Sequence, residues 1–372
     1  MNPIVVADTH ALWIRLPFEQ LGQHTPVVGL KPSPSWQWWQ NKTLAPHGQG
    51  YREARLALPP RAFGRLGKWF APLAALQIRR ICGRPKAMVY TFPVHRTFLR
   101  WFPKTPSFYY ASDDYSQDYG FDQASVLKWE MQLVRQVNHV FAVSAALADH
   151  LATLHKAPRE KFTVIPNGFP QAQIPDQLSM HPTVAPDSIP AHFRPLIGVL
   201  GGINRRLRLD WIAHAVEALP WSYWAFVGPV GDLDESASHA MARLQSHPRC
   251  VFVGHQPYET LFRYAPAFDL AVMPFQETHF NSVCSPVRFF TQLPSGRPII
   301  ATSSCRQLAQ DFGDAVTFVP NEEGLIDAIS KLRSQGFSDR REQHRWNLSR
   351  CHTWERRGNE MYQQILQTLC SF

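Results

Sequence analysis

Short apolar runs alternate with helical patterns along most of the chain. Eleven runs have the length of a strand and are rich in Val, Ile and Phe: 4–7, 87–91, 107–111, 139–143, 162–165, 196–200, 223–227, 250–253, 270–273, 298–301 and 315–319. Apolar positions at helical spacing predict helices over 127–137, 145–154, 211–218, 259–264, 287–293 and 325–332. Strands that alternate with helices indicate parallel sheets of βαβ units, so we expect an α/β fold.

A proline-rich stretch divides this pattern in two. Residues 166–195 contain seven prolines and show little periodicity, as is typical of a linker. A chain of 372 residues fits two domains of about 100–200 residues each. We expect a Rossmann-like domain over 1–168, a linker over 169–195 and a second Rossmann-like domain over 196–352. A last helix over 353–372 either stays with the second domain or crosses back to the first.

Positive charge is concentrated in the first half. Residues 1–170 carry a net charge of +10 and the remainder −1, and between Arg52 and Lys104 twelve basic residues accompany one acid, Glu53. Such one-sided charge predicts an anionic partner, which could be lipid head groups, nucleic acid or a phosphorylated substrate. No zinc, RNP-like or helix-turn-helix motif favours nucleic acid, so we expect no nucleic-acid partner.

Several features point to a cytoplasmic chain. Its six cysteines form no C-x-x-C pair and no metal-ligand spacing, which favours a reducing compartment. The first residues lack the pattern of a signal peptide, and no apolar run approaches the ~18–20 residues of a membrane span. We therefore expect a cytoplasmic protein that is at most peripheral on the inner face of the cell membrane.

Two segments of the second half have features of phosphate sites. Gly201-Gly202-Ile203-Asn204-Arg205-Arg206 follows a predicted strand, and glycines allow a diphosphate to approach the backbone. In 281–298, Ser285 is a candidate N-cap before Pro286, and Arg288 lies in the helix that Gly296 ends. Each segment taken alone is also compatible with an ordinary turn or surface helix.

Together these segments carry a resemblance to a known fold family. VIPNGF, GVLGGINRR, FVGP, VFVGH, LAVMPF and SPVRFFTQLPSGRPIIAT follow the order and spacing of the C-terminal half of GT-B glycosyltransferases across 162–302. In the first half, YYASDDYS at 109–116 resembles the Y-x-A-S-D-G stretch of xanthan-type inverting glucuronosyltransferases. It also resembles the D-D-[FY] stretch of teichuronic-acid-type enzymes. Residues 1–100 match only loosely.

The resemblance implies two Rossmann-like domains whose parallel sheets face each other across a cleft. It also implies transfer of a sugar, with inversion, from a nucleoside-diphosphate-sugar, UDP-type favoured, to an acceptor hydroxyl on a lipid-linked or cell-surface glycan precursor. By resemblance Asp113 is the catalytic base, whereas the residues alone favour helix caps or loop acids for Asp113 and Asp114. The donor residues implied are Gly202, Arg205, His255, Phe275, Ser285, Arg288 and Thr291.

We predict neither a metal nor a cofactor, because Arg205 and Arg288 would neutralise the leaving diphosphate. Asp232-Leu233-Asp234 has the D-x-D form of a metal motif, but it lies in a loop outside the context of that motif. Asp114 and the loop from Asp8 to Arg15, which includes His10, are further candidates for the cleft. These residues could equally be ordinary loop side chains.

Thr291 stands where the family has the glutamate of K-x-x-E. This departure keeps open a nucleotide-sugar-binding pseudoenzyme or a membrane-associated partner of a polysaccharide assembly system. It weighs against a nucleotide-sugar 2-epimerase.

The stretch 61–80 predicts a basic amphipathic helix. Its apolar residues recur at helical spacing and are Phe63, Leu66, Trp69, Phe70, Leu73 and Leu76. They are flanked by five cations: Arg61, Arg65, Lys68, Arg79 and Arg80. From its pattern alone, such a helix can lie on an anionic membrane surface or turn its apolar side to the protein core. A lipid-linked acceptor favours the membrane, so we expect contact with an anionic membrane surface through 61–80.

Overall fold

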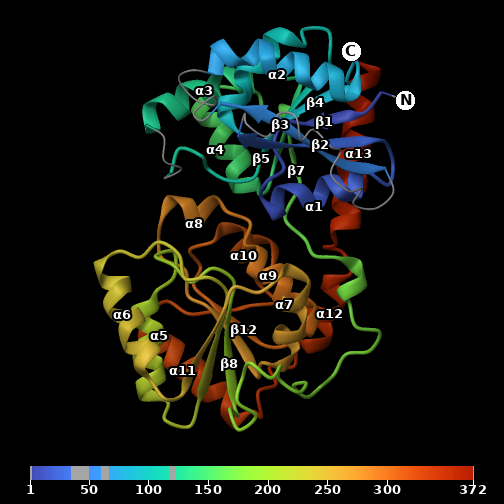
Figure 1. The fold of residues 1–372 in the computed structure, drawn as a ribbon. Helices are drawn as coiled ribbons and strands as arrows, with labels where there is room; N and C mark the ends of the chain where they lie inside the picture. The colour runs from blue at the N-terminus through green and yellow to red at the C-terminus, as the bar shows by residue number, and fades with distance from the viewer. Residues whose placement is uncertain (1, 35–49, 60–66, 118–121, 372) are drawn as a thin grey trace. The chain divides into compact units, whose positions relative to one another are not determined.

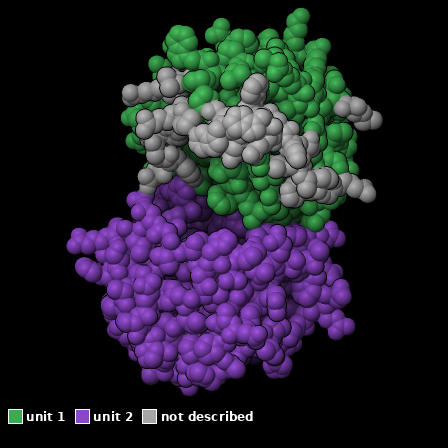
Figure 2. All heavy atoms as spheres, in the orientation of Figure 1, with its two compact units in different colours: residues 1–167, 354–372 green, residues 168–353 purple. Residues whose placement is uncertain are grey.

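The computed structural model describes residues 2–34, 50–59, 67–117 and 122–371. The chain forms two compact units (Figure 2). Unit 1 comprises 1–167 together with 354–372, and unit 2 comprises 168–353.

Unit 1 is built on a seven-stranded parallel sheet in the order β3-β2-β1-β4-β5-β6-β7 (Figure 1). Its strands are β1 (Ile4–Val6), β2 (Val27–Pro34), β3 (Tyr51–Leu58), β4 (Ala87–Tyr90), β5 (Ser107–Ala111), β6 (His139–Ala142) and β7 (Phe162–Val164). Its α-helices are α1 (Leu12–Leu21), α2 (Gly67–Cys82), α3 (Gln123–Gln136), α4 (Ala145–His155) and α13 (Trp354–Cys370).

Unit 2 is built on a six-stranded parallel sheet in the order β10-β9-β8-β11-β12-β13. Its strands are β8 (Leu196–Leu200), β9 (Tyr223–Val227), β10 (Cys250–Gly254), β11 (Leu270–Met273), β12 (Ile299–Ala301) and β13 (Thr317–Phe318). Its α-helices are α5 (Leu209–Ala218), α6 (Glu235–Ser246), α7 (Tyr258–Tyr264), α8 (His279–Val283), α9 (Val287–Gln292), α10 (Arg306–Asp311), α11 (Glu322–Ser334) and α12 (Glu342–Ser349).

The predicted α/β class with two parallel sheets is confirmed, and each predicted apolar run corresponds to a strand. Strands β2 and β3, which the sequence did not predict, form one edge of the unit 1 sheet. Their sequences, VVGLKPSP and YREARLAL, contain prolines and alternating charges instead of a continuous apolar run. β3 is the edge strand, and Pro32 and Pro34 of β2 lie beyond residues 27–29, which pair with β1. Such residues are tolerated where one side of a strand makes no hydrogen bonds within the sheet.

The linker and the final helix belong to different units. Ile189 and Phe193 of the proline-rich segment pack in an apolar cluster with Leu196 of β8, so this segment is part of unit 2. Helix α13 instead packs on α1, where a Cβ added at Gly358 would lie 2.7 Å from the Gln20 side chain. The chain therefore returns to its first unit.

The predicted basic helix is observed as α2 over its described part, whereas 61–66 lies outside the described residues. Among the helices described, none combines the length and the apolar character needed to cross a bilayer.

Candidate functional site

Each sheet contains a point at which its strand order reverses. In unit 1 the reversal lies between β1 and β4, and in unit 2 it lies between β8 and β11. Open parallel sheets bind ligands beyond the carboxyl ends of the strands at such points. The candidate residues near these points form one candidate site on unit 1 and another on unit 2.

In unit 2, the turn after β8 requires glycine. Gly201 has φ +91°, a region that side chains rarely adopt. Gly228, with φ +151°, approaches so closely that an added Cβ would lie 2.2 Å from the carbonyl oxygen of Gly201. At Gly202, by contrast, an added Cβ would meet only the side-chain amide of Asn204, at 3.5 Å. The turn therefore leaves room for a ligand to approach its backbone.

Arg288 extends from α9 to this turn. Its Nη2 donates to the Gly202 carbonyl at 2.7 Å, and its guanidinium carbon lies 5.4 Å from the ring centroid of Phe275. Its Nη1 is buried and, among the described residues, has no hydrogen-bond partner. Burial, followed by repulsion from Arg206, lowers the Arg288 pKa to about 9. A desolvated cation with an unused donor favours an anionic ligand.

Arg206 supplies a second guanidinium that the sequence reasoning missed. Its guanidinium carbon lies 4.2 Å from the Phe280 ring centroid, and its Nε donates to Asn281 Oδ1 at 3.0 Å. The Asn281 amide in turn donates to the Arg206 carbonyl at 3.0 Å. Arg206 is therefore held in place, and its charge acts on Arg288. The predicted Arg205 is instead exposed, with its Nε 3.1 Å from Asp232 Oδ2.

Helix α9 differs from its expected form. The predicted N-cap at Ser285 is wrong, since the helix begins at Val287 with Pro286 as its N-cap and no side-chain capping bond. Because α9 has only six residues, it adds little summed dipole, and Arg288 supplies the positive charge. Ser285 is buried between α8 and α9, and Gly296 ends the following turn with φ +68°, as predicted.

Three other predicted donor residues have different surroundings. Phe275 is buried, and its carbonyl accepts from Thr302 Oγ1 at 2.8 Å and from Ser304 Oγ at 3.1 Å. Thr291 is also buried, and its hydroxyl donates to the Val287 carbonyl of its own helix at 3.0 Å. His255 follows β10 and is exposed. Of these three residues, Phe275 is the one whose ring lies near the Arg288 guanidinium.

The D-x-D stretch performs local structural tasks. Asp234 is the N-cap of α6 and accepts from the Ala237 amide at 2.8 Å. Asp232 pairs with Arg205. These contacts are those of a capped loop, which is the interpretation the sequence favoured.

In unit 1, an Asp–His pair lies beyond β1. His10 Nδ1 lies 2.8 Å from Asp8 Oδ1, and its backbone amide donates to the same oxygen at 2.9 Å. The His10 ring stacks on Phe92, which follows β4, with a centroid distance of 5.7 Å. The hydrogen bond to Asp8 is the main cause that raises the His10 pKa. The sequence named His10 but did not identify Asp8 as its partner.

The predicted cleft loop from Asp8 to Arg15 is wrong in its second half. Helix α1 begins at Leu12, so Arg15 is a helical residue whose Nε pairs with Glu19 Oε1 at 2.9 Å. An i,i+4 pair of this kind stabilises the helix itself. Arg15 therefore has an observed structural contact within α1.

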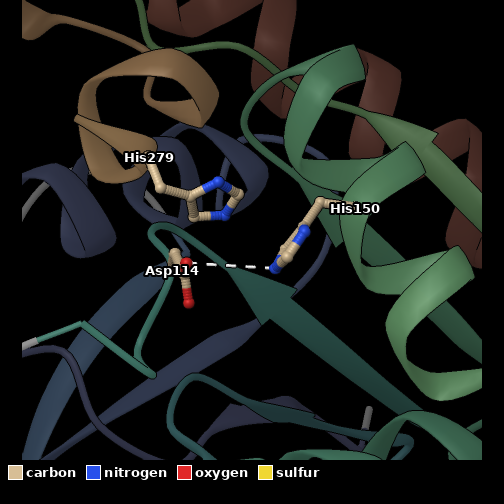
Figure 3. Close-up of side chains that lie close together, drawn as sticks. All are labelled: Asp114, His150 and His279. Atoms are coloured by element: carbon tan, nitrogen blue, oxygen red, sulfur yellow. Dashed lines mark ion pairs between the residues drawn. The ribbon is translucent and has the colours of Figure 1, made fainter. Parts of the chain in front are cut away.

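The two acids after β5 differ in burial. Asp114 is fully buried, accepts from the amide and hydroxyl of Ser116 at 3.0 and 2.6 Å, and lies 3.9 Å from His150 of α4 (Figure 3). His279, also drawn there, belongs to α8 of unit 2. Asp113 is only partly buried. Asp114 thus holds the turn, and Asp113 is the acid with more access to solvent.

Sequence comparisons identify related proteins. Residues 39–173 match the model of Glycosyltransferase Family 4. A Bacillus subtilis (strain 168) protein named as a teichuronic acid biosynthesis glycosyltransferase, TuaH, is 22% identical over 242 residues. That match covers 64% of this chain and 58% of the relative, so it spans less than two thirds of the relative's length.

Solved structures share the whole fold. Anabaena Alr3699/HepE in complex with UDP and glucose matches with a TM-score of 0.72 and 13% identity, covering 100% of both chains. A trehalose-6-phosphate synthase, described in work on glycosyl transfer with retention, matches with a TM-score of 0.69 and 8% identity, covering 99% of both chains. The chain has the GT-B fold, and residues 39–173 are similar to Glycosyltransferase Family 4; together these findings support a GT-B glycosyltransferase.

Proposed function

We propose that this chain transfers a sugar from a UDP-sugar to an acceptor hydroxyl. The observation that carries the proposal is the Arg288 guanidinium, desolvated beside the open glycine turn after β8 with a buried donor unused. The complex of the related fold with UDP and glucose supports a UDP-linked donor. A diphosphate would supply the anion that Arg288 lacks among the described residues of its unit.

We propose that the leaving diphosphate is stabilised by side chains, without a metal ion. As the bond between the sugar and the β-phosphate oxygen breaks, negative charge grows on that phosphate. Fixed cations that meet developing charge lower the barrier, because they need no reorganisation during the reaction. Arg288 and Arg206 are both held by contacts that the structure shows, which suits them to this role.

For the proton we propose Asp113 as the general base. The acceptor O–H would give its proton to the Asp113 carboxylate while the acceptor oxygen forms the new bond to the anomeric carbon and UDP leaves. One displacement of this kind inverts the anomeric centre. A carboxylate after β5 with partial access to solvent fits the role better than the fully buried Asp114.

His10 is a second candidate for the base. A histidine whose Nδ1 is hydrogen-bonded to a carboxylate is held in one orientation, which leaves its Nε2 to accept a proton. The pair lies beyond β1, at the reversal of the strand order in unit 1. Replacement of each base separately distinguishes the two candidates.

The acceptor we propose is a lipid-linked or cell-surface glycan precursor, met at the inner face of the cell membrane. Support comes from the relative named for teichuronic acid biosynthesis and from the basic character of residues 52–104. This part of the proposal concerns the acceptor and is separate from donor binding.

The test begins with a thermal-shift screen of nucleotide sugars, followed by measurement of UDP release from the donor that binds. We expect Asp113→Asn to lower kcat about 10³-fold, a typical loss for a general base, with little change in donor affinity. Asp149→Asn, which removes an exposed acid of the same unit, is the matched control and should retain wild-type kcat. The anomeric configuration of the product, read by NMR, should be inverted.

Each other outcome has a distinct meaning. If Asp113→Asn keeps full activity and His10→Gln loses activity, His10 is the general base. Retained configuration would contradict the single displacement. Donor binding without turnover of any donor–acceptor pair would favour the pseudoenzyme, and interconversion of the free nucleotide sugar would favour the epimerase.

A further inference from the structure

Helix α2 exposes three of its large apolar side chains, and most of the residues that it buries are small. Trp69, Leu73 and Leu76 are 71%, 41% and 46% exposed. Because they are spaced i, i+4 and i+7, they lie on one face of the helix, here called the α2 outer face. The residues turned to the core are mostly small: Gly67, Ala71, Ala74, Ala75, Gln77 and Ile78. An ordinary surface helix does the reverse, so the α2 outer face is suited to contact another apolar phase.

The α2 outer face continues into a basic pocket. Arg80 follows Leu76 by four residues on this face, and its neighbour Arg79 lines the pocket together with Arg84, just beyond the helix. Arg84 lines a cavity of about 480 Å³, a size within the ~300–1,000 Å³ of small-molecule sites. The lining residues, here called the basic pocket, are Arg79, Gly83, Arg84, Pro85, Trp101, Phe102, Pro103, Lys104 and Thr105.

Two of the three cations of the basic pocket, Arg79 and Arg84, donate to backbone carbonyls, and Lys104 is the third. Arg79 Nη2 donates to the Trp101 carbonyl at 2.8 Å, and Arg84 Nη2 donates to the Lys104 carbonyl at 3.4 Å. Residues 67–104 contain no acidic residue that could neutralise them. Arg79 also offsets the dipole at the end of α2, but Arg84 and Lys104 lie outside the helix and have no such task.

We propose that the basic pocket binds the phosphate of an anionic phospholipid headgroup while Trp69, Leu73 and Leu76 enter the interfacial layer of the same membrane. The two features complement each other, because aromatic and aliphatic side chains enter the headgroup–acyl boundary and cations meet the negative surface potential. The sequence indicated a membrane-facing helix, and the structure adds a defined headgroup site next to it. This binding does not depend on the proposed sugar transfer.

The test is sedimentation of the full chain with neutral phosphatidylcholine vesicles and with vesicles that contain phosphatidylglycerol. We expect binding to the anionic vesicles, weakened by salt, and little binding to the neutral ones. Arg84→Gln combined with Lys104→Gln should lower the partition coefficient about 30-fold, at about fivefold for each cation near the surface. Trp69→Ala should lower it about tenfold through lost apolar burial.

Matched controls on unit 2 separate the pocket from net charge. Arg306→Gln combined with Lys331→Gln removes two exposed cations, and Met180→Ala removes an exposed apolar side chain; both should bind as wild type. The proposal is overturned if the wild type does not prefer anionic vesicles, or if the pocket variant and the charge control bind equally. Saturable binding of glycerol phosphate without vesicle binding would also overturn it, since the source would then be a free phosphate. Unchanged donor hydrolysis in the pocket variant would show that membrane binding through the basic pocket is independent of the proposed sugar transfer.

Discussion

The positively charged side chains of the two units differ in number and in exposure to solvent. In unit 2 the candidate cations are few and fixed: Arg288 is desolvated against the glycine turn, and Arg206 is held by Phe280 and Asn281. In unit 1 the cations are many and mostly exposed along α2 and the basic pocket. A fixed, buried cation gives affinity and orientation for one small anion, whereas an array of exposed cations gives salt-dependent attraction to a surface. We therefore propose different tasks for the positive charges of the two units.

The largest effect that sharpens this comparison is expected at Arg288. Arg288→Ala removes a preorganised donor, and we expect kcat/KM for the nucleotide sugar to fall about 10²–10³-fold. Arg205 is exposed and paired with Asp232. Because an exposed ion pair contributes little free energy, Arg205→Ala should lower kcat/KM by no more than about threefold. Steady-state kinetics with the donor from the thermal-shift screen measure both. Equal losses in the two variants would contradict the separate roles of the partly buried Arg288 and the exposed Arg205.

A smaller effect concerns acid stability. Burial lowers the pKa of His95 in unit 1 to about 4, so His95 stays neutral in the folded state, whereas the unfolded chain binds a proton below about pH 6.5. The folded state is therefore destabilised as the pH falls from 6.5 toward 4, by about 2 kcal/mol at pH 5. Burial also lowers the pKa of His139 in unit 1, which acts in the same direction.

The measurement is hydrogen exchange resolved by peptide at pH 7 and pH 5, corrected for the intrinsic rates. We expect protection to fall more in unit 1 than in unit 2, and His95→Gln to reduce the difference. His214→Gln, an exposed histidine of unit 2, is the control. Equal loss of protection in both units would show that acid lability does not arise from the buried histidines of unit 1.

The smallest effect is expected at the D-x-D stretch. Asp234→Ala removes the N-cap of α6 and should lower the free energy of unfolding by about 1 kcal/mol. Donor turnover should remain unchanged, with and without added Mg²⁺. A loss of turnover restored by Mg²⁺ would assign the stretch to the donor site and would reverse its interpretation as a capped loop.

The sequence predicts the parts of the fold that depend on local residue patterns and backbone conformation. The buried strands appear as apolar runs, and the turn at Gly201 and the stop at Gly296 require positive φ, which the sequence marks with glycine. The features that were missed depend on tertiary neighbours. The edge strands β2 and β3 lack a continuous apolar pattern, and α1 begins inside a segment that reads as a loop.

The same distinction between local and tertiary determinants applies to the candidate sites of the two units. Arg288 could be predicted as a candidate from its place after Ser285-Pro286. The choice between Arg205 and Arg206 could not, because it depends on contacts of Arg206 with Phe280 and with Asn281, which lies 75 residues further along the chain. The pairing of His10 with Asp8 and the burial of Asp114 likewise depend on how the strand ends are covered. Residue type and spacing thus suggest candidate residues, and packing decides which of two neighbouring residues is held in place.

Calorimetric titration of UDP into the wild type and into Arg288→Ala, each with EDTA and with Mg²⁺, tests the central claim most directly. The account predicts that the wild type binds UDP equally well under both conditions and that Arg288→Ala binds at least tenfold more weakly in each. Binding that requires Mg²⁺, or equal affinity in the two proteins, would contradict it.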